Sequence, residues 1–289
     1  MTTRTDDVYV GRDYGAIEVR ITPELVHHYA ESVDDHNPWY FGDSPFGGPV
    51  APALVLHSQV YRNLAWYLPN IYGNLHAKQE WELFHPIMVG DTVTTRALIV
   101  ARYVKRDREY VVNEVTCLGG DGRILNRGRT HQSFLLAAAK GIVVDKEREK
   151  SGGRRFDVGA QEPLDEVPEV TKDVSLEMCR KFSGPAKNYH NDIEAARKLG
   201  FPDIVVQGMM SLCFLSQMMT ERFGAGWYVG GRMSANLVNI LWQKEQVTCR
   251  GQVTEVTPEG GAGRAHVQIW CEKPGGTKVV VGSASAVQR

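Results

Sequence analysis

Two long apolar stretches, residues 51–68 and 206–223, organise the chain. Both are apolar around most of a helical circumference, which predicts buried helices rather than surface helices. Strand-like runs follow each stretch. Each half of the chain is therefore expected to be one long helix wrapped by a mostly antiparallel sheet. The second helix is expected to pack through a stripe at helical spacing, made of Met209, Met210, Phe214 and Met218.

Each half opens with a shorter segment that carries the signals of a helix N-terminus. In the first half, Thr22 is an expected N-cap and Pro23 stands at the first helical position. Residues 172–183 are the counterpart in the second half. An irregular polar loop follows each segment, and Asp192 in the second loop is expected to cap a short helix.

The two halves align with each other at a constant offset of 154 residues, which places Cys117 on Cys271 and Gly128 on Gly282. In both halves a Gly-rich turn separates two strand-like runs, which predicts a hairpin. The shared order of elements indicates a duplicated unit of roughly 120 to 140 residues.

The segment between the halves differs from both of them. Residues 140–170 are rich in charge, Gly and Pro, and they show no sustained apolar period. Such a composition is typical of a linker. We therefore expect an α+β protein with a first repeat over 1–139, a linker over 140–170 and a second repeat over 171–289.

Composition narrows the class of protein. The chain has 289 residues, with 33 Lys and Arg against 34 Asp and Glu, and this near-neutral balance argues against a nucleic-acid partner. The N-terminal residues lack the apolar core of a signal peptide, and residues 134–144 are too short to span a membrane. A cytoplasmic protein without a membrane partner is expected. The five cysteines show neither zinc spacing nor a disulfide framework, so they are expected to be small buried side chains.

The loops before the long helices carry recognisable residues. Residues 35–40 read Asp-His-Asn-Pro-Trp-Tyr, and residues 183–192 read Ser-Gly-Pro-Ala-Lys-Asn-Tyr-His-Asn-Asp. Residues 205–209 read Val-Val-Gln-Gly-Met, and residues 84–93 place a Pro and a Gly-Asp around a strand entry. With one helix in a curled sheet, present twice, the sequence resembles the double hotdog type of the MaoC-like (R)-specific enoyl-CoA hydratases and dehydratases.

The resemblance implies an acid/base pair that this chain does not hold complete in either half. The family uses a loop Asp and a His five residues later. The first half has Asp35 but Tyr40, whereas the second half has His190 but Pro185. In related two-repeat enzymes the second half keeps the catalytic pair and the first half houses the acyl tail. The resemblance therefore favours His190 as the catalytic residue.

Addition of water to an enoyl thioester needs an acid/base group and a donor for the enolate oxygen. A histidine suits the first role. The backbone N–H of Gly208, at the opening of a buried helix, suits the second role. Gln207 stands where the family has a His and could donate a hydrogen bond, and Asn188 could orient His190 or the water.

Further residues complete the expected site. Asp35 is a third catalytic candidate, and Asn37, Tyr40 and Tyr189 are expected to line the substrate site. Each residue also has a structural interpretation: His190 could bond only to backbone, Asn188 could close an Asx-turn, and Asp35 could cap its own loop.

Three functions are compatible with these residues. The first is a hydratase or dehydratase acting on a coenzyme A or carrier-protein thioester, without a cofactor or metal. The second is a hotdog thioester hydrolase, although the buried helices lack a carboxylate before Glu221. The third is a degenerate acyl-CoA-binding protein that has lost activity. Two hotdog units already form the pseudo-dimer of this fold, so both a monomer and a homodimer are compatible with the sequence.

Overall fold

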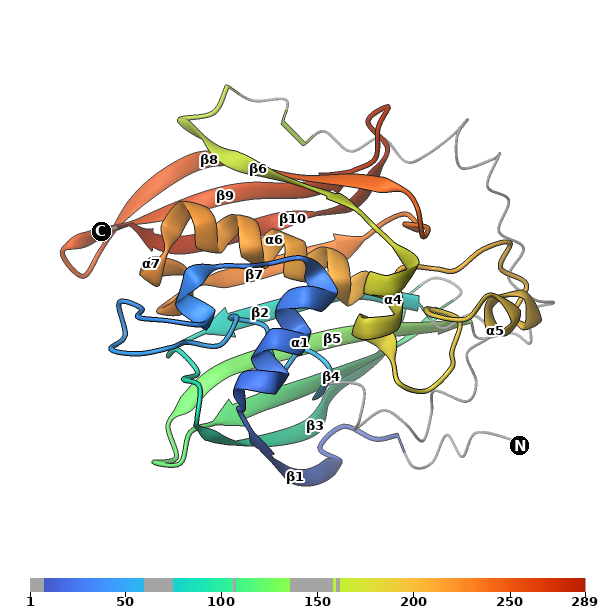
Figure 1. Ribbon diagram of the computed structural model, residues 1–289, viewed down its shortest axis with the longest axis horizontal. Helices are drawn as coiled ribbons and strands as arrows, with labels where there is room; N and C mark the ends of the chain where they lie inside the picture. Colours follow the sequence, from blue (N-terminus) through green and yellow to red (C-terminus); the bar gives the residue numbers. More distant parts are fainter. Residues whose placement is uncertain (1–7, 60–74, 106–107, 136–157, 160–161, 289) are drawn as a thin grey trace.

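A computed structural model describes residues 8–59, 75–105, 108–135, 158–159 and 162–288 (Figure 1). Its strands form one ten-stranded sheet in the order β1-β3-β4-β5-β2-β7-β10-β9-β8-β6, and every neighbouring pair is antiparallel. The first half supplies β1 (Asp13–Arg20), β2 (Leu75–Leu83), β3 (Thr92–Lys105), β4 (Arg108–Leu118) and β5 (Ile124–Leu135). The second half supplies β6 (Asp165–Asp173), β7 (Arg232–Leu237), β8 (Gln246–Glu259), β9 (Ala262–Glu272) and β10 (Lys278–Gln288). The two halves meet where β2 pairs with β7.

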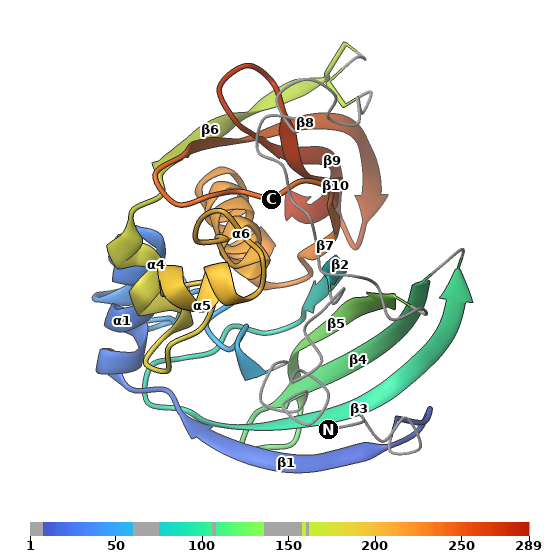
Figure 2. The same ribbon diagram turned by 90° about the vertical axis from the view of Figure 1, so that its right-hand side faces the viewer.

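The described helices are α1 (Pro23–Val33), the 3-10 helix η2 (Pro38–Tyr40), α4 (Leu176–Ser183), α5 (Ile193–Lys198), α6 (Gly208–Phe223) and α7 (Ala225–Tyr228). The strands of the second half curl around α6, which contacts β6, β8, β9 and β10 (Figure 2). The expected core stripe of α6 is confirmed, because Met209, Met210, Phe214 and Met218 are all fully buried. The α+β class is therefore confirmed. The expected arrangement of one helix inside a curled sheet is seen in the second half.

The first long helix differs from the expectation over its described part. The N–H groups of Val55 and His57 donate to the carbonyls three residues earlier, so residues 53–58 form successive turns rather than an α-helix. Pro52 has no N–H, and the tighter i to i+3 pattern is common where a helix begins. Residues 60–68 of the predicted helix lie outside the described residues.

Local signals for helix ends are confirmed. The Thr22 hydroxyl accepts a hydrogen bond from the Leu25 N–H at 3.2 Å, which caps α1. The Asp192 carboxylate accepts one from the Ala195 N–H at 2.9 Å, which caps α5. All five cysteines are buried and free.

The hairpin register repeats at the offset found in the sequence. Val115 faces Gly128 across β4 and β5, and Ile269 faces Gly282 across β9 and β10. A Cβ on either glycine would overlap a neighbouring strand: the Trp81 ring in the first half and the backbone of β7 in the second. The same close approach therefore explains the same residue type in both halves.

The second half begins earlier than the sequence indicates. β6 starts at Asp165, inside the segment 140–170 that was expected to be a linker. Val167 and Val170 are buried where β6 pairs with β8. Only two of the buried side chains of this strand are apolar, which is too few to show a period in the sequence.

Candidate active site at the start of helix α6

The loop between α4 and α6 is built around two asparagines. The Asn188 side chain donates to the carbonyls of Ser183 and Ala186 and accepts from the His190 N–H at 2.9 Å. Asn191 donates to the same two carbonyls. Asn188 thus closes the Asx-turn that was weighed for it, and a direct part in catalysis stays a prediction.

His190 has a defined orientation in this loop. Its Nδ1 lies 2.8 Å from the Val205 carbonyl oxygen. Because a carbonyl only accepts, Nδ1 carries the proton and the lone pair of the neutral ring is on Nε2. Burial lowers the pKa of His190 from 6.5 to about 4, although a backbone hydrogen bond to Val205 opposes the shift. The half-buried ring is therefore a neutral base at pH 7.

The start of α6 is closely packed. Gln207 precedes the helix without capping it through its side chain, and its Oε1 accepts from the Ser183 hydroxyl at 2.8 Å. A Cβ on Gly208 would overlap Leu237 of β7. The packing of β7 on the start of α6 thus requires the glycine. The first N–H groups of the helix have no acceptor within it.

A second histidine, His76, lies at the start of α6 and was not expected from the sequence. His76 of β2 places its Nδ1 3.8 Å from the position of a Cβ on Gly208. Its Nε2 lies 3.1 Å from the Gln79 side-chain oxygen. Burial, together with smaller effects of the charges of His131 and His190, lowers the pKa of His76 to about 4, although hydrogen bonds to Gln79 and to the Lys78 backbone oppose the shift. No sequence motif marks His76, because the pairing of β2 with β7 brings it here.

Tyr189, the expected substrate-lining neighbour, packs within the loop. Its ring centroid lies 3.8 Å from that of His190, and 5.6 Å from that of Phe201. Burial raises the pKa of the Tyr189 hydroxyl to about 12. Tyr189 therefore packs against His190 from one side, and contact with a substrate stays a prediction.

The first loop has a different chemistry. Asp35 and Tyr40 are 4% and 3% exposed, and the Tyr40 hydroxyl donates to the Asp35 carboxylate at 2.7 Å. Burial raises the pKa of Asp35, and the bond from Tyr40 and the charge of Lys172 oppose the rise. Asn37 caps η2 by accepting from the Trp39 N–H at 3.0 Å. Asp35, Tyr40 and Asn37 are thus engaged with the loop itself, and their catalytic or binding roles stay predictions.

The two loops lie at opposite ends of α6 (Figure 1). Trp39 packs against Tyr228 of α7, just beyond the end of α6, with ring centroids 6.3 Å apart. Ser183 reaches Gln207 at the other end. The 16 residues of α6 span about 24 Å at 1.5 Å per residue. Asp35 and His190 therefore do not form one acid/base pair, in agreement with the expectation that the two sites are separate.

The first half has a reduced counterpart of the α6 site. Bridges between Val50 and Met88 and between Val205 and Trp242 make Ala53 the equivalent of Gly208. A hollow of about 10 Å³ remains beside Ala53. This volume suits one water molecule and no acyl group. Tyr228 and Asn126 line this hollow. Among the described residues, the Tyr228 hydroxyl and the side-chain oxygen Oδ1 of Asn126 are buried without a hydrogen-bond partner.

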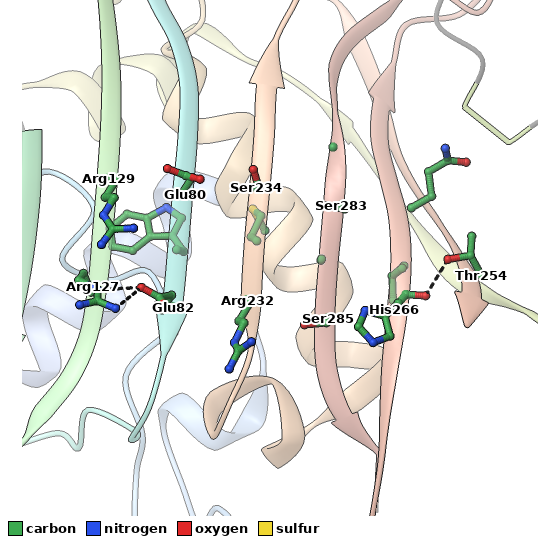
Figure 3. Close-up of a pocket in the computed structure, with 16 residues that line it drawn as sticks. Glu80, Glu82, Arg127, Arg129, Arg232, Ser234, Thr254, His266, Ser283 and Ser285 are labelled. Carbon is green, nitrogen blue, oxygen red and sulfur yellow. Dashed lines mark hydrogen bonds and ion pairs between the residues drawn. The ribbon is translucent and has the colours of Figure 1, made fainter. Parts of the chain in front are cut away.

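A larger hollow of about 570 Å³ lies on the other face of the central strands, where polar side chains stand in front of the sheet (Figure 3). Ser234, Ser283 and Ser285 form a low floor between longer side chains such as Arg127 and His266. None of the predicted site residues lines it, and neither described hollow reaches His190 or Gly208.

Two further features were sought among the described residues: a cluster of metal ligands and a helix that could span a membrane. Within the ranges given above, no three His, Cys, Asp or Glu side chains are grouped as metal ligands would be. None of the helices described there is long and apolar enough to cross a bilayer.

Part of the chain matches a known protein family. Residues 8–125 match the family described as FAS1-like, dehydratase domain region. Comparison with the sequences of curated proteins gives no match. A structure of a MaoC-like dehydratase aligns at TM-score 0.77 and 16% identity, covering 96% of this chain and 98% of that one.

Two further structures agree. A MaoC-like dehydratase from Phytophthora capsici aligns at TM-score 0.72 and 16% identity over 99% of this chain and 98% of that one. A Mycobacterium tuberculosis protein with a double hotdog fold aligns at TM-score 0.64 and 14% identity, covering 98% of each chain. The fold inferred from the resemblance of the loops is confirmed: this chain has a double hotdog fold, similar to the structures of MaoC-like dehydratases.

Proposed function

We propose that this protein is a hydro-lyase that adds water to an enoyl thioester, or removes it from a 3-hydroxyacyl thioester. The observation that carries the proposal is the orientation of His190. The Val205 carbonyl holds its Nδ1–H, so that Nε2 is left as the base in a half-buried loop beside the start of α6. The MaoC-like dehydratases that share this fold supply the reaction class.

The reaction balances with one histidine. In hydration, His190 Nε2 takes a proton from water as the water oxygen bonds to C3 of the thioester. The electrons of the double bond move to the carbonyl oxygen, and the resulting enolate is stabilised by the Gly208 N–H and the positive end of α6. The protonated Nε2 then gives its proton to C2. Dehydration is the reverse.

The missing carboxylate changes how the base is held rather than whether a base exists. The backbone carbonyl of Val205 orients the imidazole of His190. In many other histidine sites an acidic side chain has this role. A carbonyl carries no full charge, so it stabilises an imidazolium less than a carboxylate would. Burial also lowers the pKa of His190 to about 4, which makes it a weak base, so the enzyme is expected to work more slowly than one with a complete pair.

The substrate is proposed to be a coenzyme A or carrier-protein thioester. The test is hydration of a 2-enoyl-CoA series by the wild type and the His190→Ala variant. Loss of the acid/base group should lower kcat about 10²- to 10⁴-fold. Arg232→Gln, in the hollow on the other face of the sheet, is the matched control and should keep full activity. Unchanged turnover in His190→Ala would contradict the proposal.

The hydrolase alternative has its own readout. Glu221 is the first acidic residue of α6, and it lies in the last turn, where Gln217 donates to it at 2.9 Å. It is therefore far from the start of the helix, where a thioester carbonyl would bind. Release of free thiol from acyl-CoA, measured beside hydration, separates the two activities.

A further inference from the structure

We propose that the hollow on the other face of the central strands binds a phosphate monoester, with Arg232 and three serine hydroxyls holding the phosphate group. The hollow has a volume of about 570 Å³, which lies within the range of small-molecule sites. It opens on the face of the sheet that is turned away from α6 (Figure 3). The inference therefore concerns a second site and does not depend on the proposed function.

The pairing of the strands builds the hollow. Residues that face each other on neighbouring strands point to the same side of a sheet, so they form rows across it. One row crosses β5, β2, β7, β10 and β9 as Arg129, Glu80, Ser234, Ser283 and Gln268. The next row crosses the same strands as Arg127, Glu82, Arg232, Ser285 and His266. The short serines therefore form a floor on β7 and β10, and the longer side chains on both sides form the walls.

Arg232 is a cation of this hollow that has no ion pair in the described part of the chain. Its neighbour Arg127 is paired with Glu82 at 2.6 Å. Arg129 is paired in the same way with Glu114 at 2.6 Å. The carboxylate directly across from Arg232, on Glu82, is thus already neutralised by another strand.

The other carboxylates near Arg232 also have partners. Glu80 is paired with Lys78 at 2.9 Å. Hydrogen bonds from Arg264 are the main cause of the lowered pKa of Glu259, to which the charge of Arg232 contributes less. Both carboxylate oxygens of Glu259 accept from Arg264. Arg232 thus keeps a positive charge that an anionic ligand would neutralise.

The floor of the hollow offers hydroxyl groups that can donate. Among the described residues, the hydroxyls of Ser234 and Ser283 make no hydrogen bond. Ser285 Oγ accepts from the Arg264 guanidinium at 3.0 Å, so its own O–H is left to donate. A guanidinium with several hydroxyls matches the acceptor oxygens of a phosphate. Because these hydroxyls lie on two strands, they suit a tetrahedral phosphate better than a planar carboxylate.

The far wall suits the rest of such a ligand. Gln268 Oε1 accepts from the Gly159 N–H at 2.7 Å, so the amide N–H groups of Gln268 remain as donors. Thr254 adds a hydroxyl on the same side of the hollow. Amide and hydroxyl groups bind alcohols rather than hydrocarbon. We therefore infer that the organic part of the phosphate monoester carries hydroxyl groups, as in a phosphorylated sugar or polyol.

The test is calorimetric titration of the purified protein at low ionic strength with sorbitol phosphate, gluconate and sorbitol. These probes share a hydroxylated carbon chain and differ in the charged group. Sorbitol phosphate should bind at least about tenfold more tightly than gluconate, and sorbitol should not bind measurably. Tighter binding of gluconate, or no binding of sorbitol phosphate, would overturn the proposal.

Two substitutions locate the phosphate within the hollow. Arg232→Gln should weaken binding of sorbitol phosphate about 10- to 100-fold, the effect of removing a hydrogen bond to a charged group. Ser283→Asp, which places a carboxylate on the floor, should abolish binding, and Ser283→Ala should weaken it a few-fold. Arg20→Gln, on the edge strand β1, is the matched control and should keep wild-type affinity.

Thermal unfolding supplies the second readout. Without ligand, Arg232→Gln and Arg20→Gln should unfold at the wild-type midpoint, because both side chains are exposed. Sorbitol phosphate should raise the midpoint of the wild type and of Arg20→Gln, but not that of Arg232→Gln. Equal binding by Arg232→Gln and the wild type would show that the hollow is not the site. Thioester hydration is not part of this test, so its outcome leaves the proposed function unaffected.

Discussion

The loops before the two long helices share one backbone plan and differ in chemistry. In the first loop the Val50 N–H donates to the Trp39 carbonyl at 2.9 Å, and in the second the Val205 N–H donates to the Tyr189 carbonyl at 3.3 Å. The residue after each of these carbonyls occupies the position of the family's histidine. It is Tyr40 in the first loop and His190 in the second.

This difference separates a closed first loop from a second loop that is proposed to be reactive. Asp35 and Tyr40 satisfy each other in the interior, so neither is presented to a substrate. His190 bonds to the backbone through one nitrogen and keeps the other as a base. The first loop thus uses its polar pair for packing, whereas under the proposed function the second loop holds an acid/base group without a carboxylate.

The largest expected contrast is between matched substitutions at the two positions. His190→Asn should lower kcat for enoyl-thioester hydration about 10²- to 10⁴-fold, because it removes the base. Tyr40→Phe should leave kcat within about twofold, because its hydroxyl is committed to Asp35. Steady-state kinetics of both variants on one substrate measure the contrast. A large loss in Tyr40→Phe would mean that the first site is active.

The next contrast concerns the starts of the two long helical segments. A methyl group on Gly208 would overlap Leu237, so Gly208→Ala should displace the first N–H of α6 from the carbonyl it stabilises. Misplacement of this kind costs roughly 10- to 100-fold in kcat. Ala53→Gly, at the equivalent position of the first half, should leave kcat unchanged. Similar losses in both variants would argue that the glycine matters only for stability.

Stability should show the opposite ranking. Tyr40→Phe removes the side-chain donor of a buried carboxylate, which should lower the free energy of unfolding by about 1–3 kcal/mol. His190→Asn sits on a half-buried loop and should cost less. Urea unfolding at neutral pH measures both, and Arg232→Gln on the other face of the sheet is the control. A smaller loss for Tyr40→Phe than for His190→Asn would reject the closed-site description.

Most of the fold could be predicted because its signals are local. Thr22 and Asp192 cap helices where their side chains and neighbours indicate, and the stripe of α6 is buried as its spacing requires. The repeat offset could be read from the two hairpins and agrees with their register. The start of β6 could not be predicted, because a short edge strand beside a charged segment has too few inward side chains to show a period.

The candidate site was only half visible in the sequence. His190 and Gly208 stand in motifs, so the resemblance pointed to them. His76 and Tyr228 do not, because each reaches the other half only through the pairing of β2 with β7 or the packing of α7. Contacts between residues that are distant in the chain leave no local pattern.

Acid should act on the two loops with opposite signs. Burial lowers the pKa of His190 to about 4, so between about pH 6.5 and 4 the unfolded chain binds the extra proton and stability falls on acidification. Burial raises the pKa of Asp35, so the buried carboxylate destabilises the folded state at neutral pH. This destabilisation is relieved as the pH falls through the raised pKa and the carboxylate binds a proton. In His190→Asn, the loss of free energy of unfolding on acidification should therefore be smaller than in the wild type, by up to about 3 kcal/mol. Asp35→Asn should raise the free energy of unfolding most at neutral pH. Unfolding curves across this range measure both signs, and an Asp35→Asn variant that is stabilised only in acid would contradict the assignment.

The smallest effect is expected where the first loop is given the missing imidazole. Tyr40→His beside Asp35 would restore the family's pair in sequence. In a His190→Ala background it should nevertheless recover no measurable hydration, because the hollow beside Ala53 holds only about 10 Å³ and Tyr228 lines it. Steady-state assays at the highest usable enzyme concentration set the limit of detection. Opening the hollow with Tyr228→Ala in the same background tests the cause. Activity from Tyr40→His alone would show that chemistry, rather than space, silenced the first site.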